Sequence, residues 1–262
     1  MPRVTTAFAA ALALFVPIGR PLLVGLAPAV GIGAGLLSTQ AAYSMSAEDW
    51  FNSGLDKFDS EDYQGAISDY TRAIAIDPLY SDAYNSRGLA RELSDPKGAI
   101  ADFSKAIETN PQNADAYSNR AQLKLTLEDY QGALADFSIA IEINPKDSYS
   151  YLLRGVTKAT ELDDFQGAID DYTKAIEINP LDADAYGNRA ISKAELGDLK
   201  SAIADHDKSI MLDPDPLRYW SRSRTKFKMG DLEGRCADLK KAAEFDDSYF
   251  GRMSAYDVKE EC

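Results

Sequence analysis

Few residues in this chain could take part in chemistry. The sequence contains one histidine, His206, and two cysteines, Cys236 and Cys262. A catalytic histidine needs a nucleophile or a cluster of partner residues beside it, and the sequence around His206 offers neither. Two cysteines cannot form a multi-cysteine metal site, and the many aspartates lack the spacing of a calcium loop. The sequence also lacks a phosphate-binding loop and a nucleophile elbow, so we expect no catalytic residue, no metal and no cofactor.

The overall charge narrows the choice of partner. The 262 residues include 28 Lys and Arg against 42 Asp and Glu, a formal net charge of −14. Binding to nucleic acid or to an anionic membrane surface needs concentrated positive charge, so neither is expected as the main activity. A hydrophobic content of 45% with 10% aromatic residues is sufficient for a packed fold.

Residues 1–44 differ from the rest of the chain. They contain no acidic residue, two basic residues (Arg3 and Arg20) and two apolar stretches at 7–18 and 22–37. Basic and apolar residues followed by small ones are typical of an export signal. Three interpretations stay open: a cleaved signal, an uncleaved membrane anchor, or a buried part of the fold. The first two predict a body exported to the periplasm, thylakoid lumen or extracellular space, or anchored facing that side.

Prolines reveal an internal repeat. Pro78, Pro111, Pro145, Pro180 and Pro214 are 33, 34, 35 and 34 residues apart. Each proline ends a segment in which apolar residues recur every three or four positions, the period of an amphipathic helix. The residue before each proline is disfavoured in a helix, and Ser or Asp soon afterwards can cap the next one. The period therefore predicts an array of units, each containing two helices of about a dozen residues.

The repeat has a regular pattern of large and small residues. A bulky residue in the first helix recurs as Trp50, Tyr84, Tyr117, Tyr151, Tyr186 and Trp220. A small residue follows it as Gly54, Gly88, Ala121, Gly155 and Ala190, and another opens the second helix as Ala66, Ala99, Ala133, Ala168 and Ala202. This pattern resembles the tetratricopeptide repeat (TPR) family. The resemblance implies an all-α fold, an α-solenoid of about six stacked helix–turn–helix TPR units forming a right-handed superhelix.

We expect three regions along the chain. A signal or anchor at 1–44 precedes the TPR array at 47–246, and a polar tail follows at 247–262. The predicted units span about 47–80, 81–113, 114–147, 148–182, 183–216 and 217–246. The sixth unit departs from the pattern, because Arg224 stands where the small residue is expected. Terminal repeats are often atypical, since one side of them faces water.

Several residues have structural interpretations. His206 falls in the aromatic column of the second helix and is expected in the core. Cys236 falls in an aliphatic column and is expected to pack as a small apolar residue, although a disulfide to Cys262 is an alternative in an oxidising compartment. Four aspartates (Asp69, Asp102, Asp136, Asp171) are each followed 18 residues later by an arginine (Arg87, Arg120, Arg154, Arg189). This constant offset predicts that each Asp pairs with the Arg of the next unit.

The family resemblance implies a protein or peptide ligand in a concave groove lined by first helices, without catalysis. By the family's geometry, the groove residues are Leu55, Asn85, Leu89, Gln122, Leu125, Leu152, Val156, Asn188, Ile191, Arg218 and Arg222. The favoured function is a non-enzymatic interaction scaffold. The alternative is an assembly factor or chaperone adaptor that recognises an acidic or carboxyl-terminal peptide. The sequence predicts neither the partner's identity nor the oligomeric state.

The sixth unit is locally basic and matches part of a known clamp. Some family members hold a terminal carboxylate with basic and amide side chains from three units. Asn188, Arg218 and Arg222 match three of these positions, whereas Leu152 and Val156 replace the first pair. The full clamp is therefore not expected. A looser site for an acidic segment at Arg218 and Arg222, or a merely solvated basic cap, are the two interpretations.

Overall fold

The computed structural model describes residues 45–245, Val258 and Cys262. Within this part the chain forms twelve α-helices and no strand. The predicted signal or anchor at 1–44 and most of the predicted tail lie outside the described residues. Among the helices that are described, none has the length and apolar character needed to cross a membrane.

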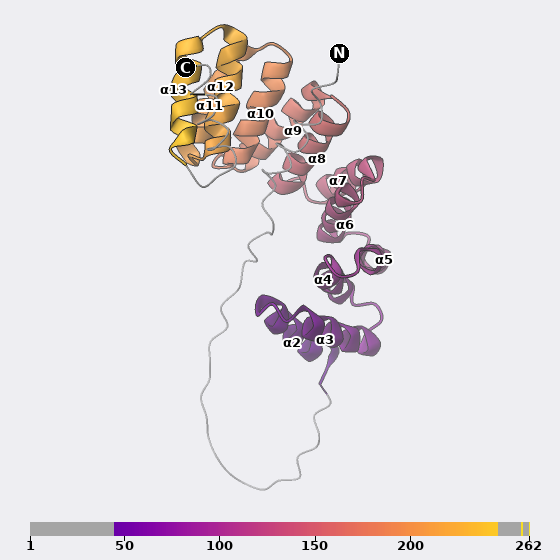
Figure 1. The fold of residues 1–262 in the computed structure, drawn as a ribbon. Coiled ribbons are helices and arrows are strands. Elements are labelled where there is room, and N and C mark those ends of the chain that lie inside the picture. Colours follow the sequence, from indigo (N-terminus) through magenta and orange to yellow (C-terminus); the bar gives the residue numbers. More distant parts are fainter. Residues whose placement is uncertain (1–44, 246–257, 259–261) are drawn as a thin grey trace, which may run out of the picture. The chain divides into compact units, whose positions relative to one another are not determined.

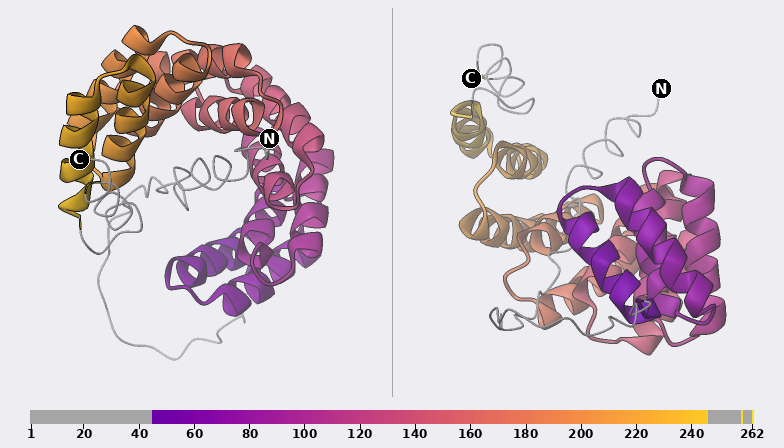
Figure 2. Two further views of the ribbon diagram at one scale, coloured as in Figure 1. Left: turned by 45° about the horizontal axis from the view of Figure 1, so that its top comes forward. Right: turned by 90° about the horizontal axis from the view of Figure 1, so that it is seen from below.

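The helices follow one another in six pairs, and in each pair the second helix lies beside the first (Figures 1 and 2). The pairs are α2 (Ala47–Asp59) with α3 (Tyr63–Ile76), α4 (Ser81–Arg91) with α5 (Pro96–Thr109), α6 (Ala114–Thr126) with α7 (Tyr130–Ile143), α8 (Ser148–Glu161) with α9 (Phe165–Ile178), α10 (Ala183–Glu195) with α11 (Leu199–Leu212), and α12 (Pro216–Met229) with α13 (Leu232–Ala243). The expected all-α solenoid of helix pairs is therefore confirmed.

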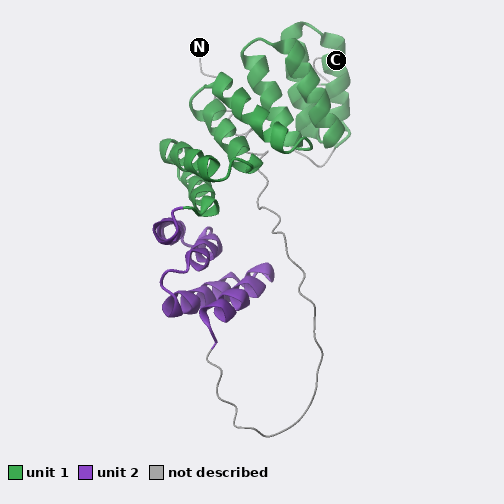
Figure 3. Cartoon of the chain, turned by 180° about the vertical axis from the view of Figure 1, so that it is seen from behind, with its two compact units in different colours: residues 1–16, 112–262 green, residues 17–111 purple. Residues whose placement is uncertain are grey.

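The described part of the chain divides into two compact units (Figure 3). The amino-terminal unit contains α2–α5, and the carboxyl-terminal unit contains α6–α13 together with Val258 and Cys262. In the latter, successive first helices approach one another more closely than successive second helices do. The first helices α6, α8, α10 and α12 therefore lie on the inner side of this unit. The handedness of a superhelix over the whole array stays a prediction.

A repeated aspartate starts each second helix. Asp129 caps α7 by accepting a hydrogen bond from the Gly132 amide at 3.0 Å, and Asp164 caps α9 in the same way from Gly167 at 2.9 Å. The same cap opens every other second helix, at Asp62, Asp95, Asp198 and Asp231. Each side chain satisfies a backbone donor that a helix start leaves unpaired, which fixes where the turn ends.

Large rings of the second helix pack directly on small residues of the first. At Gly155 an added Cβ would lie 2.7 Å from Cε1 of Tyr172, closer than a side chain permits. Gly88 is in equivalent contact with Phe103, at 2.6 Å. Both rings are fully buried. The alternation of large and small residues in the sequence thus brings the two helices of a pair together.

Buried ion pairs join the two helices of each pair, and the predicted pairing between consecutive units is wrong. Arg154 donates two hydrogen bonds to Asp171 of its own pair, at 3.0 and 2.6 Å, and Lys158 lies 2.7 Å from the same carboxylate. Equivalent two-bond pairs are Arg87–Asp102, Arg120–Asp136, Arg189–Asp205 and Arg222–Asp238. The Arg-to-Asp separation varies between 15 and 17 residues because the intervening turn absorbs the insertions. In these five pairs the arginine of the first helix therefore faces the aspartate of the second helix at equivalent positions.

The same arginines also reach the preceding pair. Arg154 donates to the Ser138 hydroxyl at 3.1 Å, and Arg189 donates to the Thr173 hydroxyl at 3.2 Å. These arginines therefore do link consecutive units, as the sequence suggested. The acceptor of the linking hydrogen bond is a hydroxyl group and not the predicted aspartate. Each guanidinium group connects three helices, which fixes the spacing of the stack.

Candidate functional site on the first helices

The first-helix face is the set of side chains that the first helices present on their inner side. In the carboxyl-terminal unit it comprises Gln122, Leu125, Leu152, Val156, Ala159, Gly187, Ile191, Ala194, Trp220, Arg224 and Phe227. In the amino-terminal unit it includes Leu55, Asn85 and Leu89, all half-buried. These positions recur with the repeat, so the fold itself brings them to one side of each unit.

The predicted groove residues of the carboxyl-terminal unit divide into two classes. Gln122, Leu125 and Ile191 are half-buried and remain accessible to a ligand. Leu152 and Val156 are buried, with 2% and 8% of their surface exposed. They pack in one apolar cluster with Tyr172 and Ile176. Leu152 and Val156 were expected to line the groove, and the structure instead places these two side chains in the core.

Asn188 and Ser192 form a buried polar site on α10. Both are at most 1% exposed, and neither the Asn188 amide nor the Ser192 hydroxyl has a hydrogen-bond partner. Asn188 was expected to face a ligand, and the structure places it instead inside the stack. A buried polar group without a partner costs about 1–3 kcal/mol, so the site favours an ordered water.

The sixth pair begins one residue earlier than the sequence suggested. Arg222 pairs with Asp238 as Arg189 pairs with Asp205, and Arg222 lies over the Tyr219 ring as Arg189 lies over Tyr186. The bulky residue of this pair is therefore Tyr219, in place of Trp220. The small position is occupied by Ser223, which is 1% exposed, and Arg224 is not a departure from the pattern.

The corrected alignment also changes the role expected of Arg218 in the predicted clamp. Arg218 falls in a column of buried positions whose other members are Ala83, Ala116, Ser150 and Ala185. It is 4% exposed, and oxygen atoms of Asp184, Asp213 and Asp215 each lie 2.8 Å from its nitrogen atoms. The Arg218 guanidinium is thus enclosed by carboxylates of this chain. An acidic ligand would have to displace them.

Arg222 is likewise paired with carboxylates of this chain. It donates to Asp238 at 2.8 and 2.5 Å and to Asp207 at 2.6 Å. These carboxylates raise the pKa of Arg222, although burial opposes the shift as the largest single influence. Both arginines assigned to a looser acidic-segment site therefore stabilise the helix stack.

The corrected alignment places other residues on the first-helix face of the sixth pair. Trp220 and Arg224 are half-buried there, and Phe227 is 57% exposed. A feature of the sequence that the expected alignment of the sixth pair did not use also indicates this alignment. Asp215 caps α12 four residues before Tyr219, as Asp182 caps α10 four residues before Tyr186.

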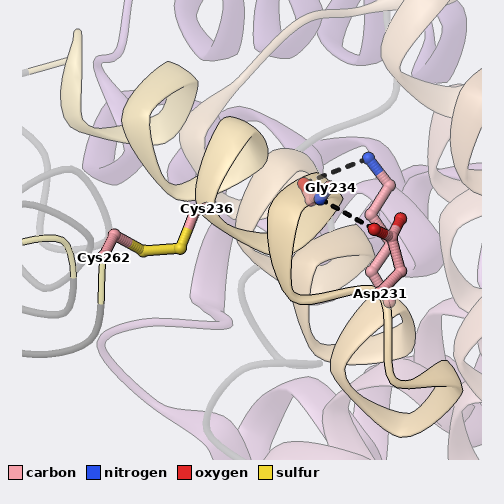
Figure 4. The surroundings of a disulfide bond; sticks show 5 residues. Asp231, Gly234, Cys236 and Cys262 are labelled. Atoms are coloured by element: carbon pink, nitrogen blue, oxygen red, sulfur yellow. Dashed lines mark hydrogen bonds between the residues drawn. A yellow bond between two sulfur atoms is a disulfide. The ribbon is translucent and has the colours of Figure 1, made fainter.

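The two cysteines form a disulfide, with their Cα atoms 5.7 Å apart. Figure 4 shows Cys262 directed at Cys236 on α13, close to the turn where Asp231 caps the helix. Of the two alternatives for Cys236, the structure selects the disulfide, and the side chain is only half-buried. The bond ties Cys262 to α13.

Comparisons with known proteins identify the repeat. Models of the tetratricopeptide repeat match residues 89–148, 148–180 and 171–204. The helix pairs within residues 89–204 are therefore tetratricopeptide repeats. Among curated proteins, none matches the sequence.

Three solved structures illustrate the similarity of the fold. PilF of Pseudomonas aeruginosa has a TM-score of 0.70 at 15% identity, covering 82% of this chain and 97% of its own. PilW, a type IV pilus biogenesis factor, has a TM-score of 0.67 at 18% identity, covering 82% and 99%. YrrB, a TPR protein with an unusual peptide-binding site, has a TM-score of 0.62 at 21% identity, covering 73% and 97%. At these identities the similarity shows the fold alone.

Proposed function

We propose that this array of tetratricopeptide repeats is a non-enzymatic interaction scaffold that holds an extended or helical segment of a partner protein on its first-helix face. The observation that carries the proposal is the accessible apolar surface on that face, at Leu125 and Ile191 in the carboxyl-terminal unit. Apolar side chains that remain accessible on a folded surface are typical of binding sites.

The roles of the polar residues support a function without catalysis. The buried aspartates of the second helices are held by ion pairs within the stack, and the aspartates of the turns cap helices. His206 is buried and hydrogen-bonded to Thr225. These groups are engaged in holding the helices together. The net charge of −14 also favours a protein ligand over nucleic acid.

An exported location is part of the proposal. The composition of residues 1–44 supports an export signal or a membrane tether. The Cys236–Cys262 disulfide supports an oxidising compartment such as the periplasm, thylakoid lumen or extracellular space.

A role as an assembly factor is the second candidate. PilW, whose fold this chain shares over 82% of its length, is a pilus biogenesis factor. We propose assembly only in the general sense that the scaffold holds a subunit of a larger complex. Recognition of a carboxyl terminus through Arg218 and Arg222 is disfavoured, because both side chains are engaged in the stack.

The scaffold proposal is tested on the apolar residues of the first-helix face. Replacing Leu125 and Ile191 by Asp should abolish recovery of partners in a pull-down with the full chain, because charged side chains cannot be buried against an apolar segment. Recovered proteins are identified by mass spectrometry, and helix content is checked by circular dichroism.

The matched control places the same substitutions outside the face. Leu181 and Leu196 lie in turns and are 74% and 52% exposed. Their replacement by Asp should leave recovery unchanged. If the Leu125 and Ile191 variant recovers the same proteins as the parent chain, the proposed function is wrong.

A further inference from the structure

We infer that the first-helix face of the amino-terminal unit is a docking site for a partner segment that carries apolar side chains next to a lysine or arginine. The site comprises Phe51, Leu55 and Phe58 of α2, Leu89 of α4, and the carboxylates of Glu48 and Glu92. The inference rests on the proposed function, since it names the chemistry of the segment that this part of the face would hold.

Apolar side chains form the centre of the site. Phe51, Leu55 and Phe58 pack on one apolar cluster with Tyr70 of α3, and all three are only half-buried. Leu89 occupies on α4 the position that Leu55 occupies on α2, and it is also half-buried. Because α2 and α4 are in contact, these side chains contribute to one surface. Their remaining apolar area is available for a partner to cover.

Glu92 places a desolvated carboxylate at one end of this surface. It follows the last residue of α4, at the position that Phe58 occupies on α2 and Leu125 on α6, so it belongs to the first-helix face. Its side chain is half-buried. Burial raises the pKa of Glu92, and no cation or hydrogen-bond donor among the described residues opposes that shift. A ligand cation beside the carboxylate would lower this pKa and stabilise the charged form.

The other end of the surface is also negative. The rings of Tyr80 and Phe51 are in contact, with centroids 5.0 Å apart. Burial raises the pKa of Tyr80, and the charges of Asp82, Glu48 and Asp77 raise it further. These carboxylates therefore lie close enough to act on the ring that borders the apolar surface. A cationic group of a ligand is attracted to this end as well.

The basic residues of the same two helices are engaged elsewhere. They are Lys57 of α2 with Arg87 and Arg91 of α4. Lys57 pairs with Asp69 of α3 at 2.5 Å. Arg87 and Arg91 pair with Asp102 of α5, at 2.6 and 2.8 Å. These cations hold the second helices, so the negative charge of the face selects a cationic ligand by complementarity.

The test uses a labelled peptide and the full chain. The probe is a fluorescein-labelled dodecapeptide with two leucines flanked by lysines, and the comparison peptide has every lysine replaced by glutamine. Fluorescence anisotropy should show tighter binding of the lysine peptide, a preference that weakens as salt is raised. The variant with Glu48 and Glu92 replaced by Gln should bind the lysine peptide about tenfold more weakly and the glutamine peptide as the parent chain does.

The matched control makes the same charge change on second helices. Glu108 of α5 and Glu142 of α7 are exposed, and replacing both by Gln should leave binding of the lysine peptide unchanged. This control accounts for the general attraction of a cationic peptide to a chain of net charge −14. Leu89→Ala is a further variant that should weaken binding of both peptides, with helix content checked by circular dichroism.

Two results would overturn the inference. One is a Glu48 and Glu92 variant that binds the lysine peptide as tightly as the Glu108 and Glu142 variant does. The other is a parent chain that does not bind the lysine peptide. Binding that then appears when Arg3 and Arg20 are replaced by Gln would assign the face to this chain's own residues 1–44, and sedimentation of the parent as a dimer would assign it to a second copy.

Failure of this site and failure of the proposed function can be told apart. The pull-down in "Proposed function" changes Leu125 and Ile191 of the carboxyl-terminal unit, whereas the peptide test changes carboxylates of the amino-terminal unit alone. A chain that loses its partners with the first pair of substitutions but shows no lysine preference keeps the scaffold function and lacks this site.

Discussion

His206 shows how burial sets the charge state of a single residue. It is 1% exposed, and its Nε2 lies 3.1 Å from the Thr225 hydroxyl. Burial, assisted by the positive charge of Arg222, lowers the pKa of His206 to about 3. The imidazole is therefore neutral in the folded protein at neutral pH. The aromatic column in the sequence predicted its place in the core, and this burial is the main cause of the lowered pKa. The smaller contribution of Arg222 was not predicted, because Arg222 was assigned to a ligand site.

This lowered pKa predicts a pH-dependent stability. The unfolded chain takes up a proton on His206 below about pH 6.5, whereas the folded chain does not until about pH 3, so stability falls as the pH decreases through this window. Lowering the pH from 7 to 5 should therefore reduce the free energy of unfolding by about 2 kcal/mol through His206. The variant His206→Phe, with the ring that Phe137 provides in an equivalent position, should lack that loss in urea denaturation. Equal losses in the parent and the variant would exclude a neutral buried His206.

At the scale of the elements, the turns within five of the six described pairs contain a left-handed residue, and the turn at 92–95 in the second pair is the exception. Gly197 and Gly230 supply it in the last two pairs, with φ of 88° and 79°. In earlier pairs Glu61, Glu128 and Asp163 adopt φ between 52° and 63°. The sequence predicted these turns from the repeat period. It did not indicate which residue has positive φ, because residues other than glycine adopt that conformation infrequently.

Relieving this strain should stabilise the array. Glu128→Gly should raise the unfolding free energy by about 0.5–1 kcal/mol, because glycine has no Cβ to clash in the left-handed conformation, a gain reduced by its greater freedom when unfolded. The reverse change, Gly197→Glu, should lower it by a similar amount. Chemical denaturation of both variants measures the pair of effects, and a destabilised Glu128→Gly variant would contradict a strained turn.

At the scale of the molecule, the repeat period indicated the helix pairs and their order. Two features depended on information that the period does not contain. One is the partner of each arginine, because a constant spacing of 18 residues could not distinguish contacts within a pair from contacts between pairs. The other is the alignment of the sixth pair, where adjacent Tyr219 and Trp220 both suit the bulky position. The aspartate caps of α10 and α12 resolve that ambiguity, since Asp182 lies four residues before Tyr186 and Asp215 lies four residues before Tyr219.

The disulfide gives a test of how stability is distributed along the stack. In a repeat array each pair contacts mainly its neighbours, so a local change should stay local. Cys236 and Cys262 are 26 residues apart, and closing such a loop contributes about 3.5 kcal/mol by chain entropy. Cys262→Ser should therefore accelerate amide hydrogen exchange in α12 and α13, while protection in α6 and α7 is retained. A uniform loss of protection from α6 to α13 would show instead that the carboxyl-terminal unit unfolds as one cooperative body.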